Sequence, residues 1–206
     1  MIRTLPIAAL LLCAAACSAP WTVRPIEETK PQAVSAGALW ESKILPAILV
    51  SAVDARVLLD SADPQAQFGH RQDNGPVYFI VKGSGRVTSV DTHSRVGIAF
   101  VDIAPFDGKP DVSIQIGPVL RGSSLRDATG LVHFSDFVNQ LQYADAANEL
   151  NDHVLKNVLA RIDAATLKGR SVTFSGTVAA EAKSDPKIEP ALRELVPAQL
   201  IVGENR

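Results

Sequence analysis

The chain has 206 residues and a formal net charge of −2, with 47% hydrophobic and 20% charged side chains. This length and apolar content suffice for one domain with an appendage. The mildly acidic balance argues against nucleic acid as a partner, because that binding needs clustered Lys and Arg. It equally argues against electrostatic adhesion to an anionic lipid surface.

The N-terminus has the pattern of a secretory signal. Arg3 precedes a short apolar run, and three alanines stand just before Cys17. The run is shorter than the roughly 20 residues that a membrane-spanning helix needs. A cysteine in this position resembles a bacterial lipoprotein signal, which is cleaved before the cysteine and diacylated on its sulfur. Acylation at Cys13 and an ordinary secretory signal are the alternatives. We predict a signal peptide over residues 1–16 and lipidation at Cys17.

This interpretation predicts a protein held by lipid in the periplasm or cell envelope. Ser18, rather than Asp, follows the cysteine and slightly favours the outer membrane over the inner. Cys13 leaves with the signal and Cys17 is acylated, so no thiol remains for a disulfide or a Cys-ligated metal. The domain must then be stable through its core alone, in an oxidising compartment.

The first part of the mature chain divides into two segments. Residues 17–34 contain three prolines among polar residues, which predicts an extended lipidated tether. A strand packed on the domain is the alternative for this segment. Residues 35–76 have apolar side chains at helical spacing. Because Pro46 is tolerated in a first helical turn, we expect a short helix to about Lys43 and a second from Pro46 to about Ser61.

From Val77 the apolar period changes to two, which predicts strands. The first strand contains Gly83 and Gly85 near its middle, where glycine usually marks a bulge or a bend. We expect strands over 77–90, 95–102, 111–116, 171–180 and 199–202, a helix over 136–162 and a proline-punctuated excursion over 183–197.

The order of these elements is β-β-β-α-β-β, which is that of the OB-fold, a small five-stranded barrel. A generic α+β sheet shares this order and is the alternative. We therefore predict an α+β, β-rich fold in which N-terminal helices precede an OB-fold-like five-stranded barrel. The barrel domain is expected to occupy residues 77–206.

Several separated motifs can be read along the chain, namely residues 39–42 with 45–46, 81–87, 116–122, 125–128, 134–140, 168–170 and 172–176. They resemble the motifs of one family of predicted periplasmic lipoproteins, known as domain of unknown function 2291. Val138 and Ser123 depart from the family pattern, which would have Thr at both positions. The resemblance implies no established activity and no agreed catalytic residues. It implies a location, and a tendency to be encoded alongside sugar-type ABC importers.

The leading functional expectation is therefore a non-enzymatic accessory or scaffold protein associated with such an importer. Its expected partners are membrane lipid, through acylated Cys17, and either importer subunits or a solute-binding protein. A lipoprotein that binds a small molecule (a sugar, a polyol or an acid) is the alternative. An uncharacterised enzyme is the third hypothesis.

The densest polar cluster lies where the third predicted strand meets the helix. Its members are Gln115, Arg121, Arg126, Asp127, Asp136, Asn139, Gln140 and Tyr143. Two guanidiniums and two amides could fork onto the hydroxyls or carboxylate of a small solute. Alternatively, the arginines pair with the aspartates and the amides tie down the loop backbone, because buried polar groups must be satisfied. Both tryptophans fall outside the predicted barrel, which weakens the case for a sugar site.

Enzyme signatures are lacking in the sequence. It contains no Gly-x-Ser-x-Gly elbow, no His-Glu-x-x-His motif and no Walker-type phosphate loop. Gly83-Ser84-Gly85 lies within a predicted strand, so we interpret it as a bend. His133 and Asp136 could share a metal, but a third ligand is not evident. We expect no catalytic residue, no metal and no cofactor.

Overall fold

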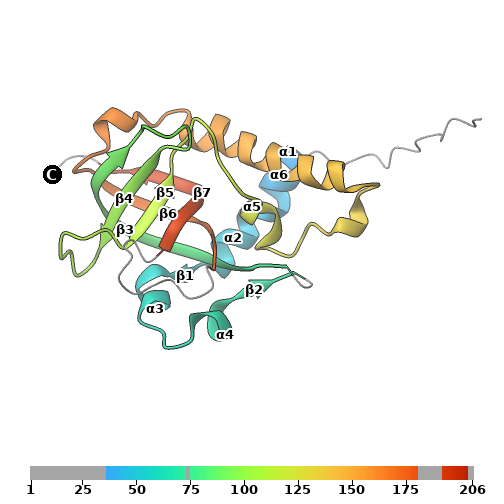
Figure 1. Ribbon diagram of the computed structural model, residues 1–206, viewed down its shortest axis with the longest axis horizontal. Coiled ribbons are helices and arrows are strands. Elements are labelled where there is room, and N and C mark those ends of the chain that lie inside the picture. Colours follow the sequence, from blue (N-terminus) through green and yellow to red (C-terminus); the bar gives the residue numbers. More distant parts are fainter. Residues whose placement is uncertain (1–35, 73–74, 181–191, 204–206) are drawn as a thin grey trace, which may run out of the picture. The chain divides into compact units, whose positions relative to one another are not determined.

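Five strands close on one another at the centre of the structure, and we call them the strand ring (Figure 1). They are β3 (Val77–Asp91), β4 (Ile98–Ile103), β5 (Val112–Gln115), β6 (Ser171–Ala179) and β7 (Leu192–Val202). The strands pair in the order β3-β4-β5-β7-β6, and β6 pairs again with β3. The β5–β7 pair is parallel and the other ring pairs are antiparallel. The predicted order of three strands, a helix and two strands is confirmed.

The computed structural model describes residues 36–72, 75–180 and 192–203. The predicted signal peptide, Cys17 and the predicted tether lie outside the described residues. Contacts divide the chain into two units, Met1–Lys30 and Pro31–Arg206, and every described residue belongs to the second. In the part of the chain that the structure describes, no helix combines the length and the apolar character needed to cross a membrane.

Strand β3 changes its partner near its middle. It pairs with β6 from Tyr78 to Arg86 and with β4 from Gly85 to Asp91. A Cβ on Gly85 would collide with the backbone oxygen of Asp102, so glycine is needed there because β4 approaches closely. The irregularity in register falls beyond the glycines, between residues 87 and 89. Gly85 is thus a point of close approach where β3 takes up its second partner, and the register shift follows two residues further along.

The N-terminal helix continues through Pro46, where a boundary between two helices was expected. Helix α1 (Ala36–Leu39), the π-helical turn η1 (Trp40–Ile44) and α2 (Leu45–Ser51) follow one another without a break. The N–H of Leu45 donates to the carbonyl of Trp40, five residues earlier, and this wider turn accommodates the missing N–H of Pro46. Trp40, Ile44 and Ile48 belong to the same buried core as the strand ring.

The predicted second helix to Ser61 is interrupted. Strand β1 (Val53–Asp54) pairs in parallel with β3, and α3 (Ala55–Leu59) begins only after it. The Asp54 side chain accepts from the N–H of Arg56 at 2.9 Å and so caps α3, which is why the helix restarts there. Helix α4 (Pro64–Phe68) and strand β2 (His70–Arg71) follow in the rest of the segment up to residue 76.

The connection between β5 and β6 is helical over a shorter span than 136–162. Helix α5 (Ser124–Asp127) and the 3₁₀ turn η2 (Phe134–Asp136) come first. Helix α6 (Gln140–Val154) follows and continues into the π-helical turn η3 (Leu155–Leu159). The 3₁₀ turn η4 (Ala164–Thr166) is the last helical element before β6. Helix α6 begins at Gln140 because the Asn139 side chain accepts from the N–H of Gln142 at 2.9 Å. Figure 1 shows α6 lying beside the strand ring, with α1 next to it.

The last strand begins earlier than residue 199. Residues 192–197 were expected to be part of the excursion, but they belong to β7 and pair with both β5 and β6. Pro197 is accommodated because the register between β6 and β7 shifts between Ser175 and Gly176. Residues 183–191 of the predicted excursion lie outside the described residues.

Candidate functional site

Arg126 and Asp127 form the centre of the predicted polar cluster. Arg126 donates from Nε to Asp127 Oδ1 at 2.6 Å and from Nη2 to Oδ2 at 3.0 Å. Their side chains are 9% and 12% exposed. The third guanidinium nitrogen, Nη1, donates to the backbone oxygen of Tyr143 at 2.7 Å, and Arg126 Cζ lies 3.5 Å from the centre of the Tyr143 aromatic ring. The guanidinium is therefore held on both its edge and its face.

Two tyrosines complete this arrangement, which we call the Arg126 network. The Tyr143 hydroxyl donates to Asp127 Oδ1 at 3.0 Å, and the Tyr78 hydroxyl donates to Oδ2 at 3.3 Å. Sequence reasoning missed Tyr78, because it comes from β3 and reaches α5 only in the folded chain. The Asp127 carboxylate thus accepts hydrogen bonds from Arg126 and from both tyrosines.

The charges of the network make it a poor acid–base centre. Burial raises the pKa of Asp127, but hydrogen bonds from Arg126, Ser123 and Tyr143 and the guanidinium charge outweigh it and hold that pKa below its ordinary value of 3.8. Burial raises the pKa of both Tyr78 and Tyr143, with a further contribution from the nearby Asp127 carboxylate. None of these shifts moves a group towards neutral pH, where a general acid or base works best.

The other predicted residues are placed around the loops. Gln115, at the end of β5, donates to the backbone oxygens of Arg121 and Glu194 and accepts from the N–H of Arg121. Arg121 itself pairs with Glu194 Oε1 at 2.7 Å on the surface. Asp136 accepts from the N–H of His133, and Asn139 caps α6. These contacts match the alternative in which arginines pair with carboxylates and amides tie down the backbone.

A pocket of about 360 Å³, which we call the tyrosine pocket, adjoins the Arg126 network. Its lining includes Gln72, Tyr78, Asp127, Phe134, Gln140 and Tyr143. Three of the eight residues predicted from the sequence, Asp127, Gln140 and Tyr143, line it, and the other five do not. Aromatic surface beside a carboxylate and amides is typical of a site for a small polar molecule.

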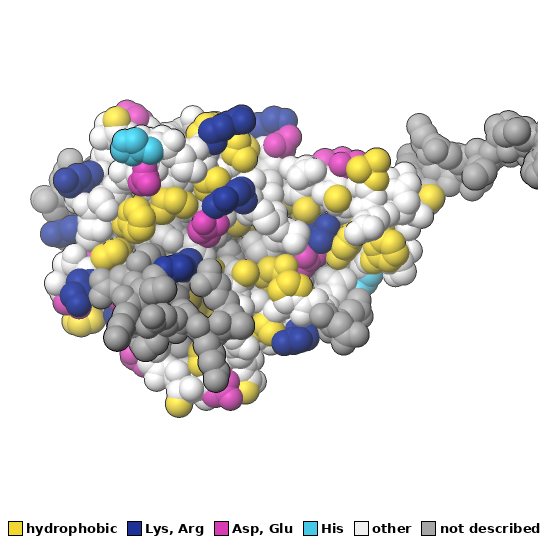
Figure 2. Space-filling view, viewed as in Figure 1, with side chains coloured by type: hydrophobic (Ala, Val, Ile, Leu, Met, Phe, Trp, Pro, Cys, Tyr) yellow, Lys and Arg dark blue, Asp and Glu magenta, His cyan; other side chains and the backbone are white. Residues whose placement is uncertain are grey.

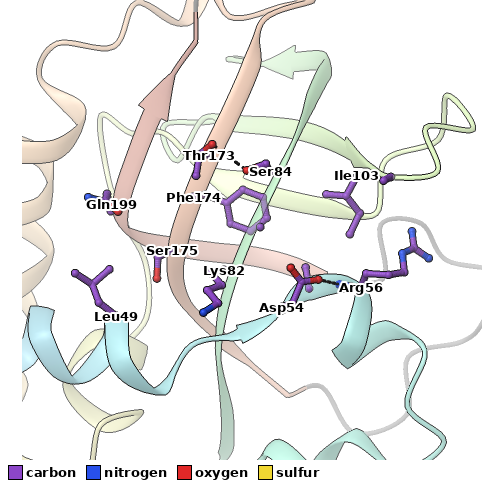
Figure 3. Close-up of a pocket in the computed structure, with 13 residues that line it drawn as sticks. Leu49, Asp54, Arg56, Lys82, Ser84, Ile103, Thr173, Phe174, Ser175 and Gln199 are labelled. Atoms are coloured by element: carbon purple, nitrogen blue, oxygen red, sulfur yellow. Dashed lines mark hydrogen bonds between the residues drawn. The ribbon is translucent and has the colours of Figure 1, made fainter.

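A second pocket, of about 460 Å³, lies where α2, β1 and α3 meet the outside of the strand ring (Figure 3). We call it the lysine pocket. Figure 3 shows Lys82, Ser175 and Gln199 on neighbouring strands, with Leu49 of α2 on one side and Asp54 on the other. Sequence reasoning missed this pocket. The alternation of polar residues along β3 and β6 was visible, but the register between the strands was not.

Among residues 36–72, 75–180 and 192–203, no group of three or more His, Cys, Asp or Glu side chains is placed to hold a metal ion. His133 and Asp136, which the sequence suggested could share one, are joined instead through the backbone N–H of His133.

Titration of the tyrosines tests the Arg126 network directly. The chain contains two tyrosines, Tyr78 and Tyr143, and both are in the network. Their folded pKa values are raised above 10.0, so the protonated phenols contribute stability below that pH, and this contribution is lost as pH rises through the folded pKa values. We expect phenolate absorbance of the native protein to develop at higher pH than in urea. Coinciding native and urea curves would contradict the network.

A strand ring of this order, with a helix between its third and fourth strands, defines the OB-fold class. The chain is similar to a crystal structure of an OB-fold protein from Thermotoga maritima MSB8, with a TM-score of 0.64 and 20% identity, over 82% of this chain and 96% of that one. At this identity the likeness concerns the fold alone. The predicted OB-like, β-rich α+β fold is confirmed.

The family follows from a second comparison. The model of a family described as predicted periplasmic lipoprotein, DUF2291, matches residues 7–200, and the chain therefore belongs to this family. The expected resemblance is confirmed, and the family description indicates a periplasmic lipoprotein. A search of curated proteins found no match.

Proposed function

We propose that the chain is a non-enzymatic accessory protein of a sugar-type ABC importer, anchored through acylated Cys17, and that it works by contacting a protein. The partner is a solute-binding protein or a subunit of the importer. An anchor in the outer membrane, which Ser18 favours, suits a solute-binding protein that diffuses through the periplasm.

The observation that carries this proposal is an exposed apolar segment that runs from the connection after α5 into the first turn of α6. Leu131, Phe134, Val138 and Leu141 are 44%, 51%, 56% and 70% exposed, although all four are large hydrophobic side chains. Figure 2 shows hydrophobic side chains gathered at the surface over this part of the molecule. Hydrophobic groups clustered in this way mark an interaction surface more often than isolated ones do. We call residues 131–141 the contact segment.

The neighbouring Arg126 network supports a structural role for the polar cluster. Its guanidinium and carboxylate hydrogen-bond to each other and to the tyrosines. They therefore hold α5 and Tyr143 of α6, which flank the contact segment on its two sides, in fixed positions. A rigid support reduces the ordering cost of binding a protein there. The low pKa of Asp127 and the raised pKa values of the tyrosines also fit a protein without acid–base chemistry.

Crosslinking in cells tests the proposal. The full-length, tagged protein is crosslinked, and mass spectrometry identifies what copurifies. We expect importer subunits or a solute-binding protein with the native chain, and a loss of most of that recovery with Leu141→Glu. Val50→Glu is the matched control, because Val50 is 86% exposed on α2, outside the contact segment. Recovery that is equal for the two variants would contradict the contact segment.

Two further outcomes separate the parts of the proposal. Cys17→Ser should release the protein from the membrane fraction, and persistence there would contradict lipidation at Cys17. If only abundant envelope proteins copurify with the native chain, the importer association is wrong.

A lipoprotein that binds a small molecule is the second candidate function, because polar side chains line both the tyrosine pocket and the lysine pocket. A ligand that binds only the folded state raises the free energy of unfolding by RT ln(1 + [L]/Kd), or about 2.7 kcal/mol at one hundred times Kd. A thermal-shift screen with sugars, polyols and acids therefore tests this candidate, and no shift with any compound would count against it.

A further inference from the structure

The lysine pocket contains a row of four polar side chains that crosses four strands. Asp54 of β1 is paired with Lys82 of β3, Lys82 with Ser175 of β6, and Ser175 with Gln199 of β7. Side chains of directly paired residues lie on the same face of a sheet. The row therefore places a carboxylate, an ammonium, a hydroxyl and an amide side by side on the outer face of the strand ring.

A second row lies two residues away on the same face. Ser84 of β3 is paired with Thr173 of β6, and their hydroxyl oxygens are 2.9 Å apart. Both line the lysine pocket, together with the first row. The pocket wall thus alternates donors and acceptors over a small area, with Leu49 and Ile103 supplying apolar surface at its sides.

Ser175 is the residue that points most directly to a ligand. It is only 4% exposed, and its hydroxyl oxygen has no hydrogen-bond partner among the described residues. A buried hydroxyl without a partner costs about 1–3 kcal/mol, so such groups usually have a role. Figure 3 shows this hydroxyl turned towards the space between Leu49 and Lys82. Within the described residues, Lys82 likewise forms no ion pair.

The tyrosine pocket also contains a buried atom without a partner among the described residues, Gln72 Oε1, but its charged group is not available to a ligand. Asp127 accepts hydrogen bonds from Arg126, Tyr78 and Tyr143, so its carboxylate is already engaged within the protein. A ligand that bound the Asp127 carboxylate would have to compete with the Arg126 network, whereas a ligand in the lysine pocket would supply a partner that Ser175 lacks. The lysine pocket is therefore the better binding site of the two.

The charges of the lysine pocket indicate a neutral ligand. Asp54 and Lys82 stand side by side with opposite charges, and Arg56 is engaged by Asp60 and Asp111. The charged groups of the pocket wall thus each have a neighbour of opposite charge. Hydroxyl groups, which both donate and accept, can satisfy carboxylate, ammonium, hydroxyl and amide side chains together. The volume of about 460 Å³ lies within the range of ordinary small-molecule sites.

We propose that the lysine pocket binds a neutral monosaccharide or polyol through Asp54, Lys82, Ser175 and Gln199. This proposal rests on the second candidate function and assigns its site and its ligand chemistry. It does not depend on the contact segment.

Calorimetric titration of the full-length protein in detergent tests this assignment. The probes are D-glucose, D-xylose and xylitol, with gluconate as the charged counterpart. We expect saturable binding of at least one neutral probe and weaker binding of gluconate. Ser175→Ala and Gln199→Ala should each weaken the affinity about five- to tenfold, as expected for the loss of one hydrogen bond. Gln140→Ala, in the tyrosine pocket, is the matched control and should bind normally.

Folding is monitored in the same variants. Ser175→Ala removes a buried hydroxyl without a partner, so it should fold as well as the native chain and its weaker binding should reflect the site itself. Binding that is weakened by Gln140→Ala but not by Ser175→Ala would overturn the lysine pocket while retaining the second candidate function. Preferential binding of gluconate would overturn the neutral ligand. No saturable binding by any probe would overturn the proposal.

Discussion

Arg126→Ala is expected to lower the free energy of unfolding by about 3–5 kcal/mol, because it leaves the Asp127 carboxylate buried without its partner. The two side chains are 9% and 12% exposed, and their two hydrogen bonds are 2.6 and 3.0 Å long. The substitution also removes the contact between the guanidinium and the Tyr143 aromatic ring. Urea unfolding of the full-length protein, followed by circular dichroism, measures the loss.

Arg121→Ala is the matched control for this prediction. Arg121 also pairs with a carboxylate, that of Glu194 at 2.7 Å, but the side chains are 60% and 48% exposed. Solvent screens such a pair, so its removal should cost less than about 1 kcal/mol. Similar losses from both substitutions would contradict the structural role assigned to the Arg126 network.

The Arg126 network also gives stability a dependence on pH. The folded pKa of Asp127 is below its ordinary value of 3.8. Its contribution is therefore present above that value and is lost as pH falls through the folded pKa. The difference in stability between the native chain and Arg126→Ala should accordingly shrink in acid.

Trp40→Ala is expected to destabilise the protein by about 3–5 kcal/mol, because it opens a cavity beneath the N-terminal helix. Trp40 is 1% exposed and lies against His153 of α6, with ring centres 5.2 Å apart. It therefore connects the helix before the strand ring to the helix inserted within it. Urea unfolding followed by circular dichroism measures this loss of stability as well. Circular dichroism is preferred to fluorescence, because the substitution removes Trp40 and with it part of the tryptophan signal.

Val50→Ala is the control for Trp40→Ala. Val50 lies in α2, the continuation of the same helix, but is 86% exposed. Its truncation should change stability by no more than about 0.5 kcal/mol. If both variants were equally stable, the N-terminal helix would not be packed as the structure has it.

The strand ring could be predicted because its elements differ in apolar period. Spacing of two along β3 and β6 and helical spacing along α6 are properties of the local sequence. Element ends were predicted less well, because they depend on single contacts. Asn139 starts α6 four residues later than expected, and Asp54 restarts the helix after β1. Pro197 suggested a loop, but the shifted register of β6 and β7 admits it to a strand.

The candidate sites depend more on the folded chain. Arg126 and Asp127 are neighbours in sequence, so their pairing could be proposed, but Tyr78 joins them from a strand far along the chain. Likewise, Asp54, Lys82, Ser175 and Gln199 come from four strands, and only the register places them in one row. Hydrophobic period specifies which face a residue occupies and not which residue lies beside it.

Closure of the strand ring also limits how other chains can bind. Each of the five strands has hydrogen-bonded neighbours on both sides, and residues 169–170 bond to Val87 where β3 passes beyond β6. A ring of this kind offers little template for strand addition, whether by an extended peptide or by a second copy. The closed ring thereby offers protection from edge-to-edge aggregation between copies of the chain. Recognition must then depend on side chains, which distinguish partners better than a bare backbone edge does.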